Sequence, residues 1–463
     1  MSGEKVSAFS GDVLGRHDAV SLSVLLAEKK VRATDLINAS IARAENVNDQ
    51  LNAIVAKDYE RARAKASSEV AGPLAGIPTF IKDTEGVEGL PLHVGSCALP
   101  GGISSESSDI VKQVESTGLI VLGTSTTPEF GLKGTTESDR FGATRNPWNT
   151  EYSTGGSSGG AAALVATGIV PIAHATVGAG SLRIPASCCG LVGLKPSRGR
   201  LAGKNVPGYF PANIFHEGVV TRTVRDTAAF FRAVEQTGGG GGLQPIGDLL
   251  QPGTVRLRVA LLTENCGGVN CDSQNIAAAQ QAADLCAGLG HHVDRIDNPF
   301  YARFDDDFWI LWAHIAFSLR YFGKRLVSPS FEHANLQDWA KFLIGHNWRN
   351  IHRMPGAFRR LKRFTAQYDH FMSNYDVLLN PTLGMPTPKL GYFGPAVPGE
   401  VHQERIKLFL PFTKYQNISG APAITLPLAT CADGLPVGIQ FAGKFGEDRK
   451  LLELAVELEQ AAP

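Results

Sequence analysis

The sequence predicts an α/β fold in which helices cover both faces of a β-sheet. Segments with apolar residues at helical spacing alternate with short apolar runs that are typical of buried strands. The alternation extends over most of the chain, with helices expected at 21–70, 109–116 and 275–289 and strands at 76–81, 119–122, 259–262 and 377–379. Such alternation favours one sheet between two helical layers over an all-helical or all-strand fold.

The first elements are read from local patterns. Apolar residues share a helix face in two N-terminal segments, at Leu22, Leu25 and Leu26 and at Leu36, Ile37 and Ile41. Thr34 is expected to cap the second helix. Residues 76–81 form an apolar run that ends at Lys82, which places this lysine at the end of a buried strand. Residues 109–116 suit a helix that stops at Gly118 before the strand at 119–122.

The length could hold about three average domains, but large α/β enzymes often exceed that average in one domain. One large domain, residues 1–463, is therefore expected, with a variable insertion at about 295–375. Residues 300–350 hold four of the five tryptophans, so this insertion is expected to be helical with an aromatic core or to form an apolar wall for a substrate. The five glycines Gly238–Gly242 predict a flexible loop.

Charge and cysteine content exclude several classes of protein. Lys plus Arg and Asp plus Glu both number 44, so no nucleic-acid or membrane partner is expected. The N-terminus has no apolar core, and the longest apolar stretch, 161–173, is too short to span a bilayer, which predicts a cytoplasmic protein. Seven scattered cysteines indicate reduced thiols. Cys266 and Cys271 lack the further ligands of a zinc site.

A lysine and two serines stand in glycine-rich surroundings at Lys82, Ser157 and Ser181. Serine is a weak nucleophile until a base removes its proton. A buried lysine can be that base, because loss of water disfavours its charged form. Ser–Lys catalysis is a known variant of the serine triad.

At these residues the chain resembles the amidase signature family, whose Ser–cis-Ser–Lys triad hydrolyses carbon–nitrogen bonds. The resemblance covers about 20–235 and 375–460, including Gly142–Asn149, Cys189–Ser197, Asn417–Pro427 and Gly434–Gln440. Some segments are similar to those of 6-aminohexanoate-cyclic-dimer hydrolase-like amidases and urethane-cleaving relatives. The resemblance implies a three-layer α/β/α sandwich around a large mixed β-sheet.

The resemblance also implies the roles of single residues. Ser181 corresponds to the acylated nucleophile, Ser157 to the proton relay after a cis peptide bond, and Lys82 to the base. Backbone N–H groups of residues 178–181 are expected to hold the oxyanion, and the supporting residues are expected to be Thr176, Ser158 and Arg183. The four oxyanion-hole residues are Gly178, Ala179, Gly180 and Ser181.

Two positions depart from the family pattern. Val177 stands where the family usually has an aspartate, which leaves open what stiffens this loop. Ala179 replaces a glycine and should be tolerated if its φ is negative.

Other functions remain open at this point. His174 could suggest a Ser–His pair, although a structural role is favoured. The motif G-x-S-x-G around Ser158 fits a nucleophile elbow, but residues 145–153 form a poor strand pattern. Carbamate or ester hydrolysis would use the same triad, while an ammonia-supplying amidotransferase subunit or a non-catalytic binding protein would share the fold.

No metal or nucleotide cofactor is expected, since the glycine loop at 178–180 lacks a dinucleotide fingerprint. The expected partner is a small amide or carbamate with an apolar part, and a homodimer is possible.

Overall fold

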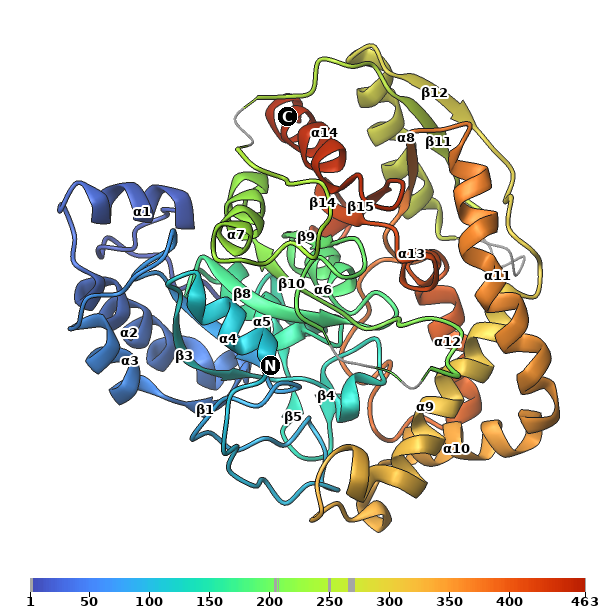
Figure 1. Ribbon diagram of the computed structural model, residues 1–463, viewed down its shortest axis with the longest axis horizontal. Helices are drawn as coiled ribbons and strands as arrows, with labels where there is room; N and C mark the ends of the chain where they lie inside the picture. The colour runs from blue at the N-terminus through green and yellow to red at the C-terminus, as the bar shows by residue number, and fades with distance from the viewer. Residues whose placement is uncertain (1–2, 204–205, 207, 249–250, 265–270, 463) are drawn as a thin grey trace.

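The computed structural model describes residues 3–203, 206, 208–248, 251–264 and 271–462 and is built around an eight-stranded mixed sheet (Figure 1). The strand order is β12 (His292–Arg295), β11 (Arg258–Leu261), β13 (Val377–Pro381), β15 (Pro436–Ala442), β14 (Ala423–Thr430), β9 (Val192–Lys195), β10 (His216–Thr221) and β8 (Ile172–Val177). Strands β12, β11 and β13 are parallel, whereas every later neighbour in this order is antiparallel.

A smaller sheet lies beside β8 and carries the predicted lysine strand. Its order is β1 (Ile54–Lys57), β3 (Ile120–Ser125) and β2 (Pro78–Lys82). The hydroxyl of Thr79 donates to the carbonyl of Ile172 at 3.0 Å, which ties β2 to β8. Two short ladders complete the strands, β4 (Glu137–Ser138) with β5 (Gly142–Ala143) and β6 (Arg145–Asn146) with β7 (Asn149–Ser153).

Helices cover both faces of the large sheet and enclose two apolar cores. One face is covered by α7 (Val224–Gln236), α8 (Ser273–Gly288) and α14 (Asp448–Ala461), with α1 (Ala19–Ala27) and α4 (Asp109–Ser116) packed against α7. The other carries α5 (Gly159–Ala166), α6 (Arg183–Cys189) and α13 (Lys414–Ser419). Along β13, Leu378 enters one core while Val377 and Leu379 enter the other, as strand geometry requires. The predicted three-layer sandwich is confirmed.

The remaining helices form two groups, one near the N-terminus and one between β12 and α13. Helices α2 (Ala33–Leu51) and α3 (Tyr59–Ala66) pack together near the small sheet. A helical region follows β12 and comprises α9 (Phe304–Leu326), α10 (Asp338–Asn350) and α11 (Met354–Met372), to which α12 (Gly399–Phe409) adds after β13. In Figure 1 these yellow and orange helices form one side of the molecule. Helix α9 packs along both α10 and α11.

Most of the elements predicted from local patterns are confirmed, but the prediction of helices alone over 21–70 is wrong, because strand β1 lies between α2 and α3. The helix at 109–116 has the predicted bounds, and strands occur at the predicted positions in β2, β3, β11 and β13. The prediction of Thr34 as a cap is wrong, because α2 begins at Ala33 and the cap position is Arg32. The poor strand pattern at 145–153 nevertheless forms a hairpin, β6 with β7.

The glycine run forms turns after α7, with positive φ at Gly238, Gly240, Gly241 and Gly242. The possible metal ligand Cys266 lies outside the described residues.

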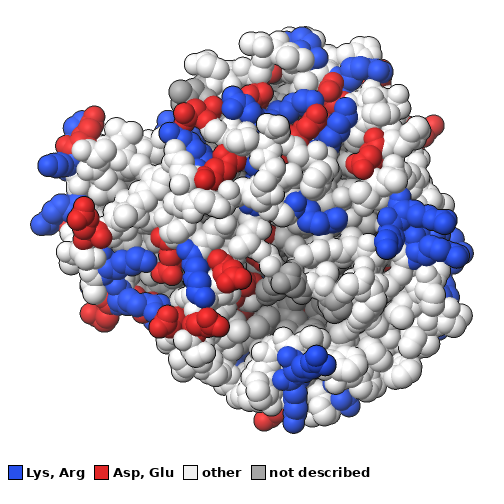
Figure 2. All heavy atoms as spheres, viewed as in Figure 1, with Lys and Arg blue, Asp and Glu red and all other residues white. Residues whose placement is uncertain are grey.

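Charged side chains are not evenly spread over the surface. Figure 2 shows acidic and basic side chains interspersed over the N-terminal helices at the left, whereas Lys and Arg gather over α11 at the right. This helix contains the run Arg359, Arg360, Lys362 and Arg363. No helix among the described residues is long and apolar enough to cross a bilayer.

Candidate active site

Lys82 ends β2 inside the protein, fully screened from solvent. Phe80 and Lys82 point to the same face of the strand, toward the core that includes α5 and α6. The Lys82 amine, Nζ, lies 2.7 Å from Ser157 Oγ and 2.9 Å from Thr176 Oγ1. The structure therefore brings together three of the predicted residues, Lys82, Ser157 and Thr176.

Ser157 lies just before α5 and follows a cis peptide bond after Gly156. The backbone N–H of the next residue, Ser158, donates to the carbonyl of Ser181 at 3.1 Å, which holds the loop before α6 beside the start of α5. Ser181 is only 6% exposed and lines a cavity. Among the described residues no hydrogen bond joins the hydroxyls of Ser157 and Ser181 directly.

Ser158 points away from a nucleophile's position. Its hydroxyl donates to the backbone carbonyl of Thr176 at 3.1 Å, and the side chain is completely buried. Although β7 does precede this segment, Ser158 is thus engaged with β8, and the geometry speaks against the nucleophile-elbow alternative.

The loop from Gly178 to Ser181 has the form that the oxyanion prediction requires. Within the described part of the chain, no group accepts a hydrogen bond from the backbone N–H of Ala179, Gly180 or Ser181. Gly180 has a φ of +121°, and a Cβ there would lie 2.5 Å from Thr413 Oγ1, so only glycine fits. Ala179 does not have a positive φ, which is the condition under which this alanine is tolerated.

Thr413, just before α13, and Asn417, within it, hold this loop where Val177 replaces the expected aspartate. Thr413 Oγ1 donates to the carbonyl of Ala179 at 2.6 Å, and Asn417 Nδ2 donates to the carbonyl of Val177 at 3.3 Å. Arg183 is wholly buried and donates to Thr413 O and Asn417 Oδ1 at 2.8 and 2.6 Å. Sequence reasoning found Arg183 but missed Thr413, because their contact joins segments far apart in the chain.

Burial lowers the pKa of the Arg183 guanidinium to about 9. The group is compensated by oxygen acceptors, which include the side chains of Gln416 and Gln440 at 3.1 and 2.5 Å. Through these hydrogen bonds the buried guanidinium connects α6 with α13 and β15.

His174 lies behind the lysine and away from Ser181. Its Nδ1 accepts from the backbone N–H of Lys82 at 3.3 Å, and its Nε2 is 3.1 Å from Glu217 Oε2. Since Nδ1 is the acceptor, Nε2 carries the proton and donates to the carboxylate. This geometry supports the structural role over a Ser–His pair.

The cavity beside Ser181 is narrow and mostly apolar. Its empty space is about 350 Å³ when the solvent at its mouth is counted. Aromatic side chains of α9 form one wall, and aliphatic side chains of α6 and α12 form another. The side chains that make these walls are Phe308, Trp309, Trp312, Ile184, Ile406 and Leu410. The aromatic region predicted as a substrate wall thus borders the candidate nucleophile.

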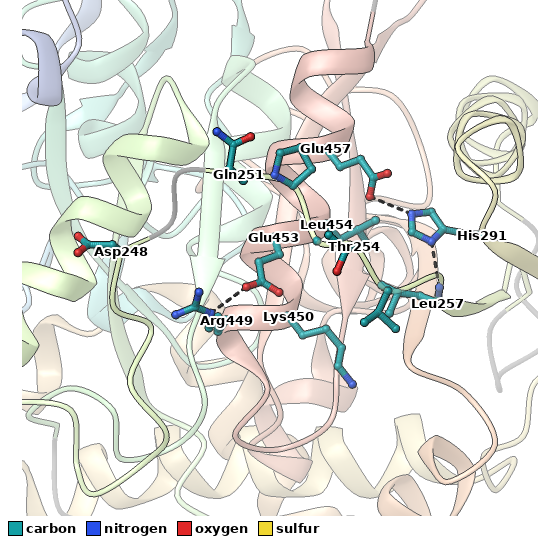
Figure 3. A pocket seen from close by; sticks show the side chains of 13 residues that line it. Asp248, Gln251, Thr254, Leu257, His291, Arg449, Lys450, Glu453, Leu454 and Glu457 are labelled. Atoms are coloured by element: carbon teal, nitrogen blue, oxygen red, sulfur yellow. Dashed lines mark hydrogen bonds and ion pairs between the residues drawn. The ribbon is translucent and has the colours of Figure 1, made fainter.

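A larger cavity, of about 1310 Å³ including open solvent, lies elsewhere, between the α14 helix and the segment before β11. Figure 3 shows two contacts between its polar side chains, Arg449 with Glu453 and His291 with Glu457. The described residues that line it include no serine or cysteine. Size therefore does not identify the reactive site in this protein, whereas the buried lysine does.

Comparisons with known proteins agree with this geometry. A family model described as Amidase matches residues 35–452. AmiC of Mycobacterium tuberculosis, which is named an amidase, is 42% identical over 99% of this chain and 97% of its own length. A 6-aminohexanoate-cyclic-dimer hydrolase of Paenarthrobacter ureafaciens is 32% identical over 96% of this chain and 95% of its own. A solved structure of 6-aminohexanoate cyclic dimer hydrolase with substrate superposes with a TM-score of 0.87 at 30% identity, covering 96% of this chain and 97% of that one.

Proposed function

Because the chain belongs to the amidase family, we propose that it is a serine hydrolase that cleaves amide bonds through an acyl-enzyme on Ser181. The observation that carries the proposal is the fully buried Lys82 amine, 2.7 Å from the hydroxyl of Ser157. An amine without water around it favours the neutral form, which can accept a proton.

In the first half of the reaction Ser181 Oγ attacks the carbonyl carbon of the amide. Its proton passes to Ser157, which gives its own proton to Lys82. The negative oxygen that forms accepts hydrogen bonds from backbone N–H groups of residues 178–181. When the carbon–nitrogen bond breaks, Ser157 protonates the leaving nitrogen and recovers a proton from Lys82.

Water completes the cycle by attacking the acyl-enzyme, with the same relay removing the water's proton and returning one to Ser181. A serine suits the relay because a hydroxyl both donates and accepts. The two serine hydroxyls must come within hydrogen-bond distance when substrate binds. Catalytic contacts are often loose without substrate, so this tightening is expected.

A hydrolysis screen tests the proposal with p-nitroanilides, primary amides, linear amide oligomers and aryl carbamates. We expect activity on at least one amide and a loss of about 10⁴-fold or more in Ser181→Ala. Ser158→Ala, a matched hydroxyl deletion one residue from the relay, should lose far less. Activity that survives Ser181→Ala but disappears in Ser158→Ala would overturn the assignment.

The same screen separates the remaining candidates. A carbamate or an ester presents the same carbonyl carbon to Ser181, so preference for aryl carbamates would identify a urethane-cleaving enzyme. An amidotransferase subunit would act on glutamine only with a partner chain, and a binding protein would hydrolyse nothing. The aromatic side chains beside Ser181 support a small substrate with an apolar part. A homodimer and a cytoplasmic location remain part of the proposal.

A further inference from the structure

Lys133 is a buried cation in the wall of the cavity that Ser181 lines. The indole N–H groups of Trp312 and Trp339 both donate to the carbonyl of the preceding residue, Leu132, at 3.3 and 3.0 Å. These two bonds fix the backbone next to Lys133. The backbone of Lys133 is therefore held beside the cavity, and its side chain is buried and does not extend into solvent.

The ammonium of Lys133 lacks a close partner. The residue is only 3% exposed, yet no described carboxylate lies within 4.0 Å of its Nζ and no described group forms a hydrogen bond with it. Burial lowers the pKa of Lys133, while more distant carboxylates oppose this shift. Those carboxylates belong to Asp139, Glu129, Glu137 and Asp338.

The nearby buried carboxylates are already engaged. Glu129 accepts from Ser96 Oγ at 2.7 Å and from the backbone N–H of Gln337 at 2.9 Å. Glu137 accepts from Thr135 Oγ1 at 2.7 Å and from the backbone N–H of Gly391 at 2.8 Å. Asp139 and Asp338 are exposed, so water screens them. These groups favour the charged lysine without contacting it.

A second lysine in the same cavity provides a comparison. Lys414 Nζ lies 2.9 Å from Asp305 Oδ1, and both side chains are buried, so this charge is balanced within the protein. Lys133 has no such counterpart among the described residues. The indole N–H of Trp309, in the same cavity wall, is also buried without an acceptor. Two of the residues that line the cavity thus have a donor, the Lys133 ammonium and the Trp309 indole N–H, with no partner among the described residues.

We propose that Lys133 binds a carboxylate of the substrate, so that the enzyme acts on small amides that carry a carboxylate group. A carboxylate is the acceptor that best matches an ammonium in an apolar wall, and charge-assisted hydrogen bonds are stronger than neutral ones. The inference rests on the proposed amide hydrolysis, because the occupant of the cavity is taken to be the substrate of Ser181.

Binding tests the inference without relying on turnover. Four probes are titrated into Ser181→Ala protein: glutaryl-p-nitroanilide, its uncharged analogue pentanoyl-p-nitroanilide, N-butyryl-4-aminobenzoate and N-butyrylaniline. The two pairs place the carboxylate on the acyl or the amine side. We expect the carboxylate member of at least one pair to bind about tenfold tighter or more, and this preference to fall below about threefold once Lys133→Met is added.

The control is Lys407→Met in the same Ser181→Ala background. Lys407 is a partly exposed lysine on α12, the helix that contributes Ile406 to the cavity. This variant removes an equal charge outside the cavity, so the carboxylate preference should persist. Equal binding of charged and uncharged probes overturns the inference, as does a preference that survives Lys133→Met or disappears equally in Lys407→Met.

Turnover by the Ser181-containing enzyme separates the two proposals. If uncharged amides are hydrolysed and Ser181→Ala abolishes this, the proposed function holds whatever the carboxylate probes show. If the carboxylate preference is present in binding but no amide is cleaved, the recognition by Lys133 holds and the proposed reaction fails.

Discussion

The loops around Lys82, Ser157 and Ser181 and the helical wall that borders the cavity beside Ser181 are held in different ways. On the sheet side, Lys82, Ser157 and the loop before α6 are connected by hydrogen bonds to backbone groups or to each other, such as Thr413 to the Ala179 carbonyl at 2.6 Å. On the helical side, contacts between rings dominate, for example Phe308 stacked on Trp312 at 5.8 Å.

This difference indicates that the two sides have different roles, the sheet side in positioning groups and the helical side in excluding water. Directional bonds fix reacting groups to within fractions of an ångström, as catalysis requires. Ring packing excludes water but provides few directional contacts, and one indole N–H of the helical wall, that of Trp309, has no acceptor among the described residues. We expect variants of the sheet side to lower the reaction rate and variants of the wall to change binding.

Replacing Lys82, the proposed base, should have the largest effect. In Lys82→Met the relay loses its proton acceptor, so kcat/KM near neutral pH should fall by about 10³- to 10⁴-fold. Steady-state kinetics on the best amide of the screen measures this. A circular dichroism melt of the same variant checks that the fold persists. Near-normal activity in folded Lys82→Met would show that another group is the base.

Breaking the buried ion pair between Lys414 and Asp305 should lower the stability of the protein more than its reaction rate. Lys414→Met leaves the Asp305 carboxylate in apolar surroundings without its partner at 2.9 Å, at a cost of about 3–5 kcal/mol in the free energy of unfolding. Lys133→Met is the matched change at an unpaired lysine and should cost little. Urea denaturation compares the two, and equal losses would contradict the difference in pairing.

Removing the anchor of the oxyanion loop should affect both stability and rate. Thr413→Val keeps the shape of the side chain but leaves the Ala179 carbonyl without its donor, at a cost of about 1–3 kcal/mol. We expect kcat to fall more than KM rises. Thr167→Val is the control, because its hydroxyl donates to Ala163 O at 2.7 Å at the end of α5. If both variants lower kcat equally, the anchor has no special role.

The smallest effect is expected in the larger cavity of Figure 3. Glu453→Gln weakens a surface pair with Arg449, in which the arginine is 49% exposed. Such pairs contribute about 0–1 kcal/mol, and kcat/KM should stay within about twofold. A large loss of activity would mean that this cavity contributes to the reaction, contrary to the assignment of the site beside Ser181.

Local patterns were enough to predict the elements whose causes are local. The apolar run before Lys82 identified the buried strand β2, and the apolar spacing at 109–116 identified α4 with its bounds. The start of α2 and the β6–β7 hairpin were not predicted correctly. Asp35 reaches back to the backbone N–H of Arg32 at 3.2 Å, so α2 starts earlier than Thr34 suggests. The β6–β7 hairpin has few buried side chains, so it gave no apolar signal.

The resemblance to a family supplied the positions of Lys82, Ser157 and Ser181, while the surroundings of the site needed the structure. Thr413 and Asn417 approach the oxyanion loop from more than 200 positions away, with separations of 234 and 240 residues. No spacing in the sequence could reveal these contacts. The sequence could not show that Lys133 lacks a carboxylate partner either. That depends on how the folded chain places the four carboxylates whose charges act on it from a distance.

The most direct test of the account is covalent labelling with a fluorophosphonate, followed by mass spectrometry of the labelled peptide. The probe reacts only with a serine whose proton is removed by a base. We expect a single adduct on Ser181, no adduct in Ser181→Ala and much slower labelling in Lys82→Met. An adduct on Ser158, or labelling at an unchanged rate in Lys82→Met, would contradict it.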